Sequence, residues 1–175
     1  SLAFRPKDQL PEVVFVGRSN VGKSTLINSL TAKKIAFPSK KAGKTKLLNY
    51  FLIGDSFYLV DTPGYGFTSY GERETEIFGE MMEDYFADAL LKAVVLVLDA
   101  RRELNSEDRQ FLDYLAKGTV PLIIAYSKVD LLNQSEIFHL KEKVAKLHAF
   151  QVIYCCGHPD RDLVPLKSAI AKALS

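Results

Sequence analysis

A glycine-rich segment near the start of the chain has the residue types that hold phosphate groups. Residues 17–25 read GRSNVGKST, and four of them fit the spacing G-x-x-x-x-G-K-[ST]: Gly17, Gly22, Lys23 and Ser24. Glycines let the backbone wrap around phosphates, a lysine reaches the β- and γ-phosphates, and a serine hydroxyl ligates Mg²⁺. The segment follows the apolar run at 12–16 and precedes a predicted helix, which is the context that the motif requires. The sequence therefore predicts a phosphate-binding loop whose other members are Arg18, Ser19, Asn20, Val21 and Thr25.

The segment DTPG at 61–64 follows a second apolar run and carries the next candidate groups. Asp61 is placed to hold Mg²⁺ through its water shell, and the Gly64 amide is placed to contact the γ-phosphate. Loss of that phosphate would release the segment, which predicts a two-state switch. Thr62 and Pro63 complete the segment and are expected to lie beside the nucleotide.

Between these two segments lies KKAGKTKL at 40–47. Thr45 is the only serine or threonine between Lys40 and the following strand, so it is the predicted second hydroxyl ligand of Mg²⁺, with Ser24 as the first. Its neighbours are also expected to line the nucleotide: Gly43, Lys44, Lys46 and Leu47. The predicted catalytic groups are Lys23, Thr45, Asp61 and Gly64.

The run IIAYSKVD at 123–130 ends in residues that suit a purine base. Asp130 is placed to accept two hydrogen bonds from guanine N1–H and the exocyclic amine, and adenine offers no matching donors. The stem of Lys128 would cover the face of the base, with Val129 between them. Ser127 stands where many GTP-binding proteins have asparagine, and its shorter side chain is expected to tie this loop to the phosphate loop. A backbone N–H from Tyr154, Cys155 or Cys156 is expected to reach guanine O6.

These groups need a scaffold of strands and helices that alternate along the chain. Apolar runs predict strands at 12–16, 47–53, 56–60, 93–98, 121–126 and 150–154, with a hairpin at Gly54-Asp55. Amphipathic spacing predicts helices at 23–32, 74–90, 106–117, 135–148 and 162–173. Such alternation is typical of an α/β fold. We therefore expect a P-loop NTPase three-layer sandwich: a mostly parallel six-stranded sheet with one antiparallel strand and helices on both faces. Residues 1–10 would be an N-terminal extension and 11–175 one GTP-binding domain.

Composition says more about the cellular compartment of the protein than about its binding partners. A chain of 175 residues with 47% hydrophobic residues suits one domain, and a net charge of +2 is uninformative about nucleic acid. The longest apolar run, at 93–98, is far too short to span a membrane. Two adjacent cysteines are poorly placed to form a disulfide with each other. We therefore expect a monomer without membrane segments in the reducing cytoplasm.

In this order, the segments GRSNVGKSTLINSL, KKAGKTKLLNYF, LVDTPGYGF, LVLDARRE, YSKVDLL and YCC resemble the EngB-type ribosome-assembly GTPases of the Era-like group. The likeness runs from about Pro11 to the C-terminus. In members of that family, the sequence of the base-reading loop is similar to Thr-Lys-x-Asp. Ser127 therefore keeps a hydroxyl at the position of the threonine. The chain departs from the family pattern in DTPG, where DLPG is commoner, and in YCC, where a sequence like Phe-Ser-Ser is usual.

The resemblance implies hydrolysis of GTP to GDP with Mg²⁺ and a role in assembly of the large ribosomal subunit or its rRNA precursor, with links to cell division and septation. Asn20 stands where related GTPases use an asparagine to bind K⁺ near the phosphates, and the alternative is a purely structural asparagine. Tyr65 follows DTPG where many small GTPases place a water-orienting glutamine, which predicts slow intrinsic hydrolysis. Six lysines and no acidic residue lie within 33–46. Such a run is either ordinary solvated surface or a contact for RNA phosphates.

Two other functions remain open on the sequence alone. A P-loop ATPase or nucleotide kinase would share the phosphate loop but would lack a use for Asp130 at guanine-reading spacing from Lys128. A non-catalytic nucleotide-dependent binding module would keep the switch and lack hydrolysis, with Tyr65 as the mark of lost activity.

Overall fold

The structure of the protein is a computed structural model, which describes residues 5–32, 48–65, 82–145, 150–155 and 163–175. Several residues that the sequence assigns to the nucleotide site lie outside the described residues: Gly43, Lys44, Thr45, Lys46, Leu47 and Cys156. Residues 74–81 of the helix predicted at 74–90 also lie outside them, and residues 82–86 are helical.

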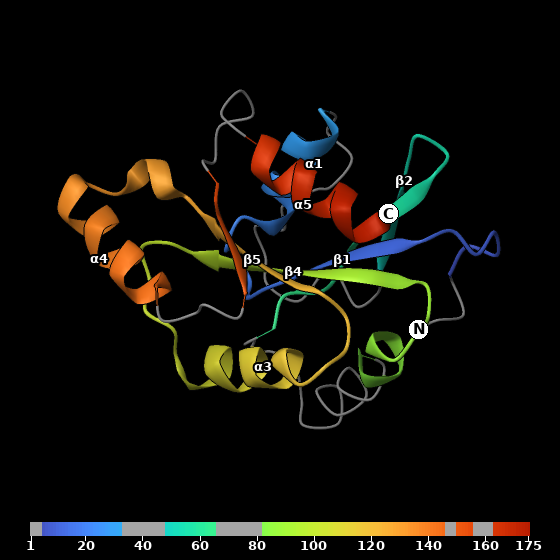
Figure 1. Cartoon of the computed structure of the whole chain (residues 1–175), viewed down its shortest axis with the longest axis horizontal. Coiled ribbons are helices and arrows are strands. Elements are labelled where there is room, and N and C mark those ends of the chain that lie inside the picture. Colours follow the sequence, from blue (N-terminus) through green and yellow to red (C-terminus); the bar gives the residue numbers. More distant parts are fainter. Residues whose placement is uncertain (1–4, 33–47, 66–81, 146–149, 156–162) are drawn as a thin grey trace.

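The centre of the fold is the predicted six-stranded sheet (Figure 1). Its strands are β1 (Glu12–Val16), β2 (Asn49–Ile53), β3 (Phe57–Asp61), β4 (Leu91–Asp99), β5 (Leu122–Ser127) and β6 (Gln151–Tyr154). They lie in the order β2-β3-β1-β4-β5-β6, and only the β2–β3 pair is antiparallel. The prediction of a mostly parallel sheet with one antiparallel strand is confirmed.

The structure describes α1 (Lys23–Thr31), α3 (Ser106–Ala116), α4 (Gln134–Val144) and α5 (Val164–Leu174). Two of these four described helices, α3 and α4, begin at a side-chain cap. Asn105 and Asn133 each start a helix with a capping box, in which the asparagine oxygen accepts the amide three residues later and an acidic side chain accepts the asparagine amide. Pro165 lies in the first turn of α5, where no hydrogen bond needs its missing N–H.

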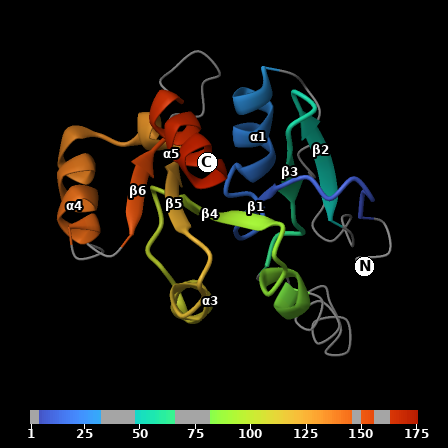
Figure 2. The ribbon, with the colours of Figure 1, turned by 45° about the vertical axis from the view of Figure 1, so that its right-hand side comes forward.

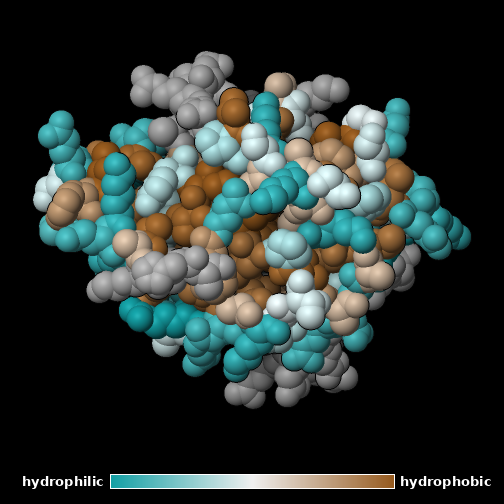
Figure 3. Space-filling model, in the orientation of Figure 1, coloured by the Kyte–Doolittle hydropathy of each residue, from teal (hydrophilic) through white to brown (hydrophobic). Residues whose placement is uncertain are grey.

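Helices cover both faces of the sheet, so the chain has three layers (Figure 2). The apolar core on one face packs α1 and α5 against the sheet, and the core on the other packs α3, α4 and residues 82–86. Every residue of β1 is buried, as expected for a parallel strand covered on both sides. Figure 3 shows hydrophobic residues toward the middle of one view and hydrophilic residues toward its edges. Among the described residues, no helix has the length and apolar character needed to cross a membrane.

The hairpin between β2 and β3 has a three-residue loop, one residue longer than the Gly54-Asp55 turn predicted. Gly54 and Asp55 both have positive φ, 52° and 54°, and the Ser56 amide donates to the Ile53 carbonyl at 3.0 Å. Two consecutive residues in the left-handed conformation reverse the direction of the chain. Ser56 completes the loop and brings Phe57 opposite Ile53.

The described part of the N-terminal segment is bonded to the sheet at the end opposite the predicted nucleotide site. The Arg5 guanidinium pairs with Glu12 of β1 and with Asp88, which precedes β4. The hydroxyl of Tyr85 donates to the second oxygen of Glu12 at 2.6 Å, so this buried carboxylate has two partners. Division of the chain at residue 10 stays a prediction.

Candidate functional site

The predicted site residues gather at one edge of the sheet, where the parallel strands end. β1 runs into the phosphate loop, β3 ends at Asp61, β4 ends at Asp99 and β5 ends at Ser127. In sheets of this kind, ligands bind outside the carboxyl ends of the strands. The edge is therefore the place where side chains from distant parts of the chain meet one ligand.

The phosphate loop leaves β1 at Gly17 and enters α1 at Lys23. A Cβ on Gly17 would come within 2.6 Å of the Val97 carbonyl oxygen of β4, so the loop passes too close to the next strand for a side chain. Gly22 has φ of 98°, a conformation that favours glycine. Because α1 starts directly after it, the first backbone N–H groups of that helix face the loop and attract anions.

Three side chains of the predicted site meet beside this helix N-terminus. The Lys23 ammonium pairs with the Asp61 carboxylate and donates to the Thr62 carbonyl at 2.5 Å. The Ser24 hydroxyl donates to the other Asp61 oxygen at 3.3 Å. Lys23 and Asp61 are both buried, which strengthens their attraction and fixes the two loops relative to each other.

The segment after Asp61 is paired with the phosphate loop through the backbone. Tyr65 donates its amide to the Gly17 carbonyl at 3.2 Å, and its carbonyl accepts the Ser19 amide at 3.4 Å. A Cβ on Gly64 would lie 2.7 Å from the Ser19 nitrogen and 2.8 Å from its Cα. Glycine at 64 is thus required by the close approach of the two loops, in addition to the phosphate contact predicted for its amide.

The Tyr65 side chain points to α3. Its hydroxyl donates to Asp108 at 2.9 Å, its ring packs on Phe111, and Arg18 of the phosphate loop lies 4.0 Å from the same carboxylate. Burial and the neighbouring Asp108 charge raise the pKa of Tyr65, so this phenol stays protonated. Sequence reasoning missed Asp108, because as the third residue of α3 it reads only as half of a capping box.

The loop predicted to read the base is hydrogen-bonded to the phosphate loop. The Ser127 hydroxyl lies within hydrogen-bond reach of the Val21 and Leu98 carbonyls, so it joins β5 to the phosphate loop and to β4. Lys128 follows with φ of 61°, and its ammonium donates to the Asn20 carbonyl and to Asp99, both at 2.8 Å. The predicted link between the Ser127 side chain and the phosphate loop is confirmed.

Asp130 lies on a short 3-10 turn, Val129–Leu131, and its side chain is exposed. Selection of guanine against adenine was expected from a buried Asp130. The carboxylate would become buried only when the base itself covers it. The Val129 amide donates to the Cys155 carbonyl at 3.3 Å, which fastens this turn to the end of β6.

The prediction that Cys155 offers its amide to guanine O6 is wrong. That amide donates to the Tyr126 carbonyl at 2.7 Å, because the hydrogen-bond ladder between β5 and β6 continues one residue past Tyr154. The Cys155 side chain is buried in the core beside α5, where it packs as a small apolar residue. The same role for Cys156 falls outside the described residues.

The available donors fit Mg²⁺ better than a metal that needs a protein cage. In the described part of the chain, no group of three or more His, Cys, Asp or Glu side chains is placed to hold a metal ion. Ser24 and Asp61 supply oxygen atoms beside the Lys23 ammonium. Mg²⁺ prefers oxygen, keeps several waters and takes few protein ligands when phosphates supply the rest.

Comparison with known proteins agrees with this geometry. Residues 12–128 match the family described as 50S ribosome-binding GTPase. The probable GTP-binding protein EngB of Lactobacillus gasseri is 39% identical over 143 residues, which cover 81% of this chain and 74% of that protein. The crystal structure of a probable GTP-binding protein EngB has a TM-score of 0.71 and 27% identity, covering 93% of this chain and 98% of that one.

A more distant likeness concerns the fold alone. The structure of Era in complex with MgGDPNP and nucleotides 1506–1542 of 16S ribosomal RNA has a TM-score of 0.74 at 23% identity. The match covers 94% of this chain and 56% of the Era chain.

Proposed function

The chain belongs to the EngB family of GTP-binding proteins, whose members hydrolyse GTP, and we propose on this premise that it is a Mg²⁺-dependent switch in assembly of the large ribosomal subunit. The observation that carries the proposal is the double tie between the two nucleotide loops. Ser127 bonds to Val21, and Lys128 bonds to Asn20. Because these bonds hold the phosphate loop and the base-reading loop together, the two loops would bind the two ends of one nucleotide.

At the base end, Asp130 would accept the guanine N1–H and exocyclic amine, and the stem of Lys128 would lie against the base. The stem is already fixed, since its Cε lies 3.7 Å from the position of a Cβ on Gly22. Val129 and Tyr154 would flank the base. Asp130 would make the site prefer guanine to adenine, because adenine lacks the matching hydrogen-bond donors.

At the phosphate end, the chain would supply fixed positive charge. Lys23 and the N-terminal amides of α1 would face the β- and γ-phosphates, and the Gly64 amide would meet the γ-phosphate. Ser24 would hold Mg²⁺, with Asp61 behind its water shell and Thr45 as the second hydroxyl; the ion would neutralise charge on the phosphates. The remaining residues proposed to line the nucleotide are Arg18, Ser19, Thr25, Gly43, Lys44, Lys46, Leu47, Thr62, Pro63 and Cys156.

Intrinsic hydrolysis is proposed to be slow, because no glutamine follows DTPG to orient the attacking water. Tyr65 stands there, and Asp108 holds its hydroxyl at 2.9 Å, toward α3. A partner would then have to complete the site, as activating proteins do for other switches.

Single-turnover hydrolysis, with and without purified large ribosomal subunits, tests the proposal. We expect an intrinsic rate below about 0.01 s⁻¹ and a clear acceleration by large subunits, with co-sedimentation in the GTP form and release in the GDP form. Small subunits serve as the control particle. An intrinsic rate above about 1 s⁻¹ would contradict slow hydrolysis, and equal co-sedimentation in both nucleotide states would contradict the switch.

The lysines of 33–46 would provide the RNA contact. Binding through phosphates weakens steeply with salt, so ribosome affinity should fall between low and moderate ionic strength and in the variant Lys40→Glu plus Lys41→Glu. The control pair is Lys167→Glu plus Lys172→Glu on α5. If ribosome affinity changes neither with salt nor in Lys40→Glu plus Lys41→Glu, the lysine run does not contact the ribosome.

K⁺ at Asn20 is a separate proposal. Asn20 is exposed at the turn of the phosphate loop, with φ of 63°. A monovalent cation there would add positive charge near the phosphates, so hydrolysis in KCl should exceed hydrolysis in NaCl by roughly tenfold, the size of about 1.4 kcal/mol of barrier. Steady-state phosphate release at matched ionic strength measures this, and equal rates in the two salts would exclude it.

Membership of a GTPase family disfavours the ATPase, kinase and non-catalytic alternatives. Competition of ATP against GTP distinguishes the first two, and phosphate release in the presence of ribosomal subunits distinguishes the third. A cytoplasmic, monomeric protein with a link to cell division and septation stays a proposal from the resemblance.

A further inference from the structure

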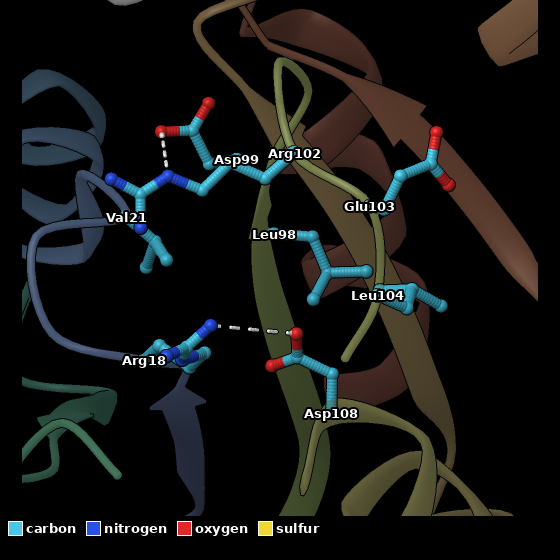
Figure 4. A pocket seen from close by; sticks show the side chains of 8 residues that line it. All are labelled: Arg18, Val21, Leu98, Asp99, Arg102, Glu103, Leu104 and Asp108. Atoms are coloured by element: carbon cyan, nitrogen blue, oxygen red, sulfur yellow. Dashed lines mark ion pairs between the residues drawn. The ribbon is translucent and has the colours of Figure 1, made fainter. Parts of the chain in front are cut away.

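Asp99, the last residue of β4, is a buried carboxylate that the sequence analysis did not assign to the nucleotide site. Its side chain is only 1% exposed and accepts hydrogen bonds from the Arg101 amide at 3.1 Å, from the Arg101 guanidinium at 2.8 and 3.0 Å, and from the Lys128 ammonium at 2.8 Å. Figure 4 shows it at one end of a small pocket beside the phosphate loop, with Asp108 at the other end.

The carboxylate stays ionised at neutral pH. Burial raises the pKa of Asp99, but hydrogen bonds from Arg101 and Lys128 outweigh it and hold the pKa well below its usual range. A buried charge of this kind needs each of its partners, and one of them is the residue proposed to cover the base.

Lys128 needs an anchor because its backbone is in an unfavourable conformation. Its φ of 61° lies in the left-handed region, which non-glycine residues rarely adopt. Its ammonium spans the Asp99 carboxylate and the Asn20 carbonyl, and its stem crosses Gly22. The turn that carries Asp130 begins at this residue, so the position of Asp130 depends on where Lys128 is held.

We propose that Asp99 is a positioning residue for guanine recognition, acting through Lys128 to fix the turn that presents Asp130. This inference rests on the proposed GTP site. Because the base makes the same contacts before and during hydrolysis, loss of Asp99 should weaken nucleotide binding without changing the chemical step.

The test is Asp99→Asn, which keeps the shape of the side chain and removes its charge. We expect the Kd of GTP and of GDP to rise by about tenfold, the usual cost of one hydrogen bond to a charged group, with kcat at saturating GTP unchanged. The preference for GTP over inosine triphosphate should shrink, because inosine lacks the exocyclic amine and loses less when Asp130 moves.

Two further variants separate positioning from folding. Arg101→Ala removes contacts from the same carboxylate while leaving the Asp99–Lys128 pair, so it should keep the GTP-to-inosine preference even where it lowers the melting temperature. Lys128→Met keeps the stem and removes the ammonium, so it should reproduce the loss of preference. Adding Asp99→Asn to Lys128→Met should cost no further affinity if both act by one route.

The outcomes are distinct. Unchanged Kd and unchanged preference in Asp99→Asn would overturn the inference, as would a full additional loss in the double variant. If Asp99→Asn does not fold, an unchanged GTP-to-inosine preference in Lys128→Met overturns it equally. Failure of the proposed function has another signature, which is a wild-type protein that binds ATP as tightly as GTP.

Discussion

Replacing Lys23 with alanine is expected to lower kcat/KM for GTP by about 100-fold or more, the cost of removing one preorganised group that stabilises charge in the transition state. Lys23 starts α1 and its ammonium lies against Asp61 and Thr62, so no other described cation occupies that position. GTP binding by titration and phosphate release under single-turnover conditions measure the two contributions.

The same substitution leaves Asp61 buried without its cation. Removing one partner of a buried ion pair costs about 3 kcal/mol of folding stability, so activity should be measured well below the melting temperature of the variant. Lys92→Ala is the matched control, because Lys92 is exposed on β4 at the opposite end of the sheet. Wild-type kcat/KM in Lys23→Ala would show that the phosphate loop was misinterpreted.

Replacing Asp130 with asparagine is expected to weaken GTP binding by about 100-fold, since hydrogen bonds to a charged acceptor contribute about 1.5–3 kcal/mol each. The variant should bind xanthosine triphosphate in preference to GTP, because an asparagine amide donates to the second carbonyl of xanthine where the carboxylate accepted an amine. Competition between the two nucleotides at equilibrium measures the reversal.

Asp130 is exposed, so this substitution should change the free energy of unfolding by less than about 0.5 kcal/mol. Asp113→Asn provides a control with the same chemical change on the exposed side of α3. Retention of GTP affinity and of GTP-over-xanthosine preference in Asp130→Asn would exclude the guanine-reading role of this loop.

The fold and the two nucleotide loops followed from short contiguous segments. GRSNVGKST and YSKVD are each read within a few residues, and the apolar runs that precede them become β1 and β5. The burial pattern of each strand is set locally, which explains why the parallel sheet was predictable. The tie from Ser127 to the phosphate loop was also predictable, because a known motif fixes what that position touches.

The partners of the loops were decided only by the tertiary structure. Asp99 lies 29 positions from Lys128, and Asp108 lies 43 positions from Tyr65; each pair meets because parallel strands separated by a helix end at the same edge. Asp99 lies in the family-like segment LVLDARRE, but no motif there predicts a bond from its side chain to Lys128. Cys155 shows the converse, since its amide looked available in sequence and is consumed by the ladder between β5 and β6. Sequence therefore determined which groups are proposed to hold the nucleotide. The crossover connections of the sheet decided which buried charges hold those groups in place.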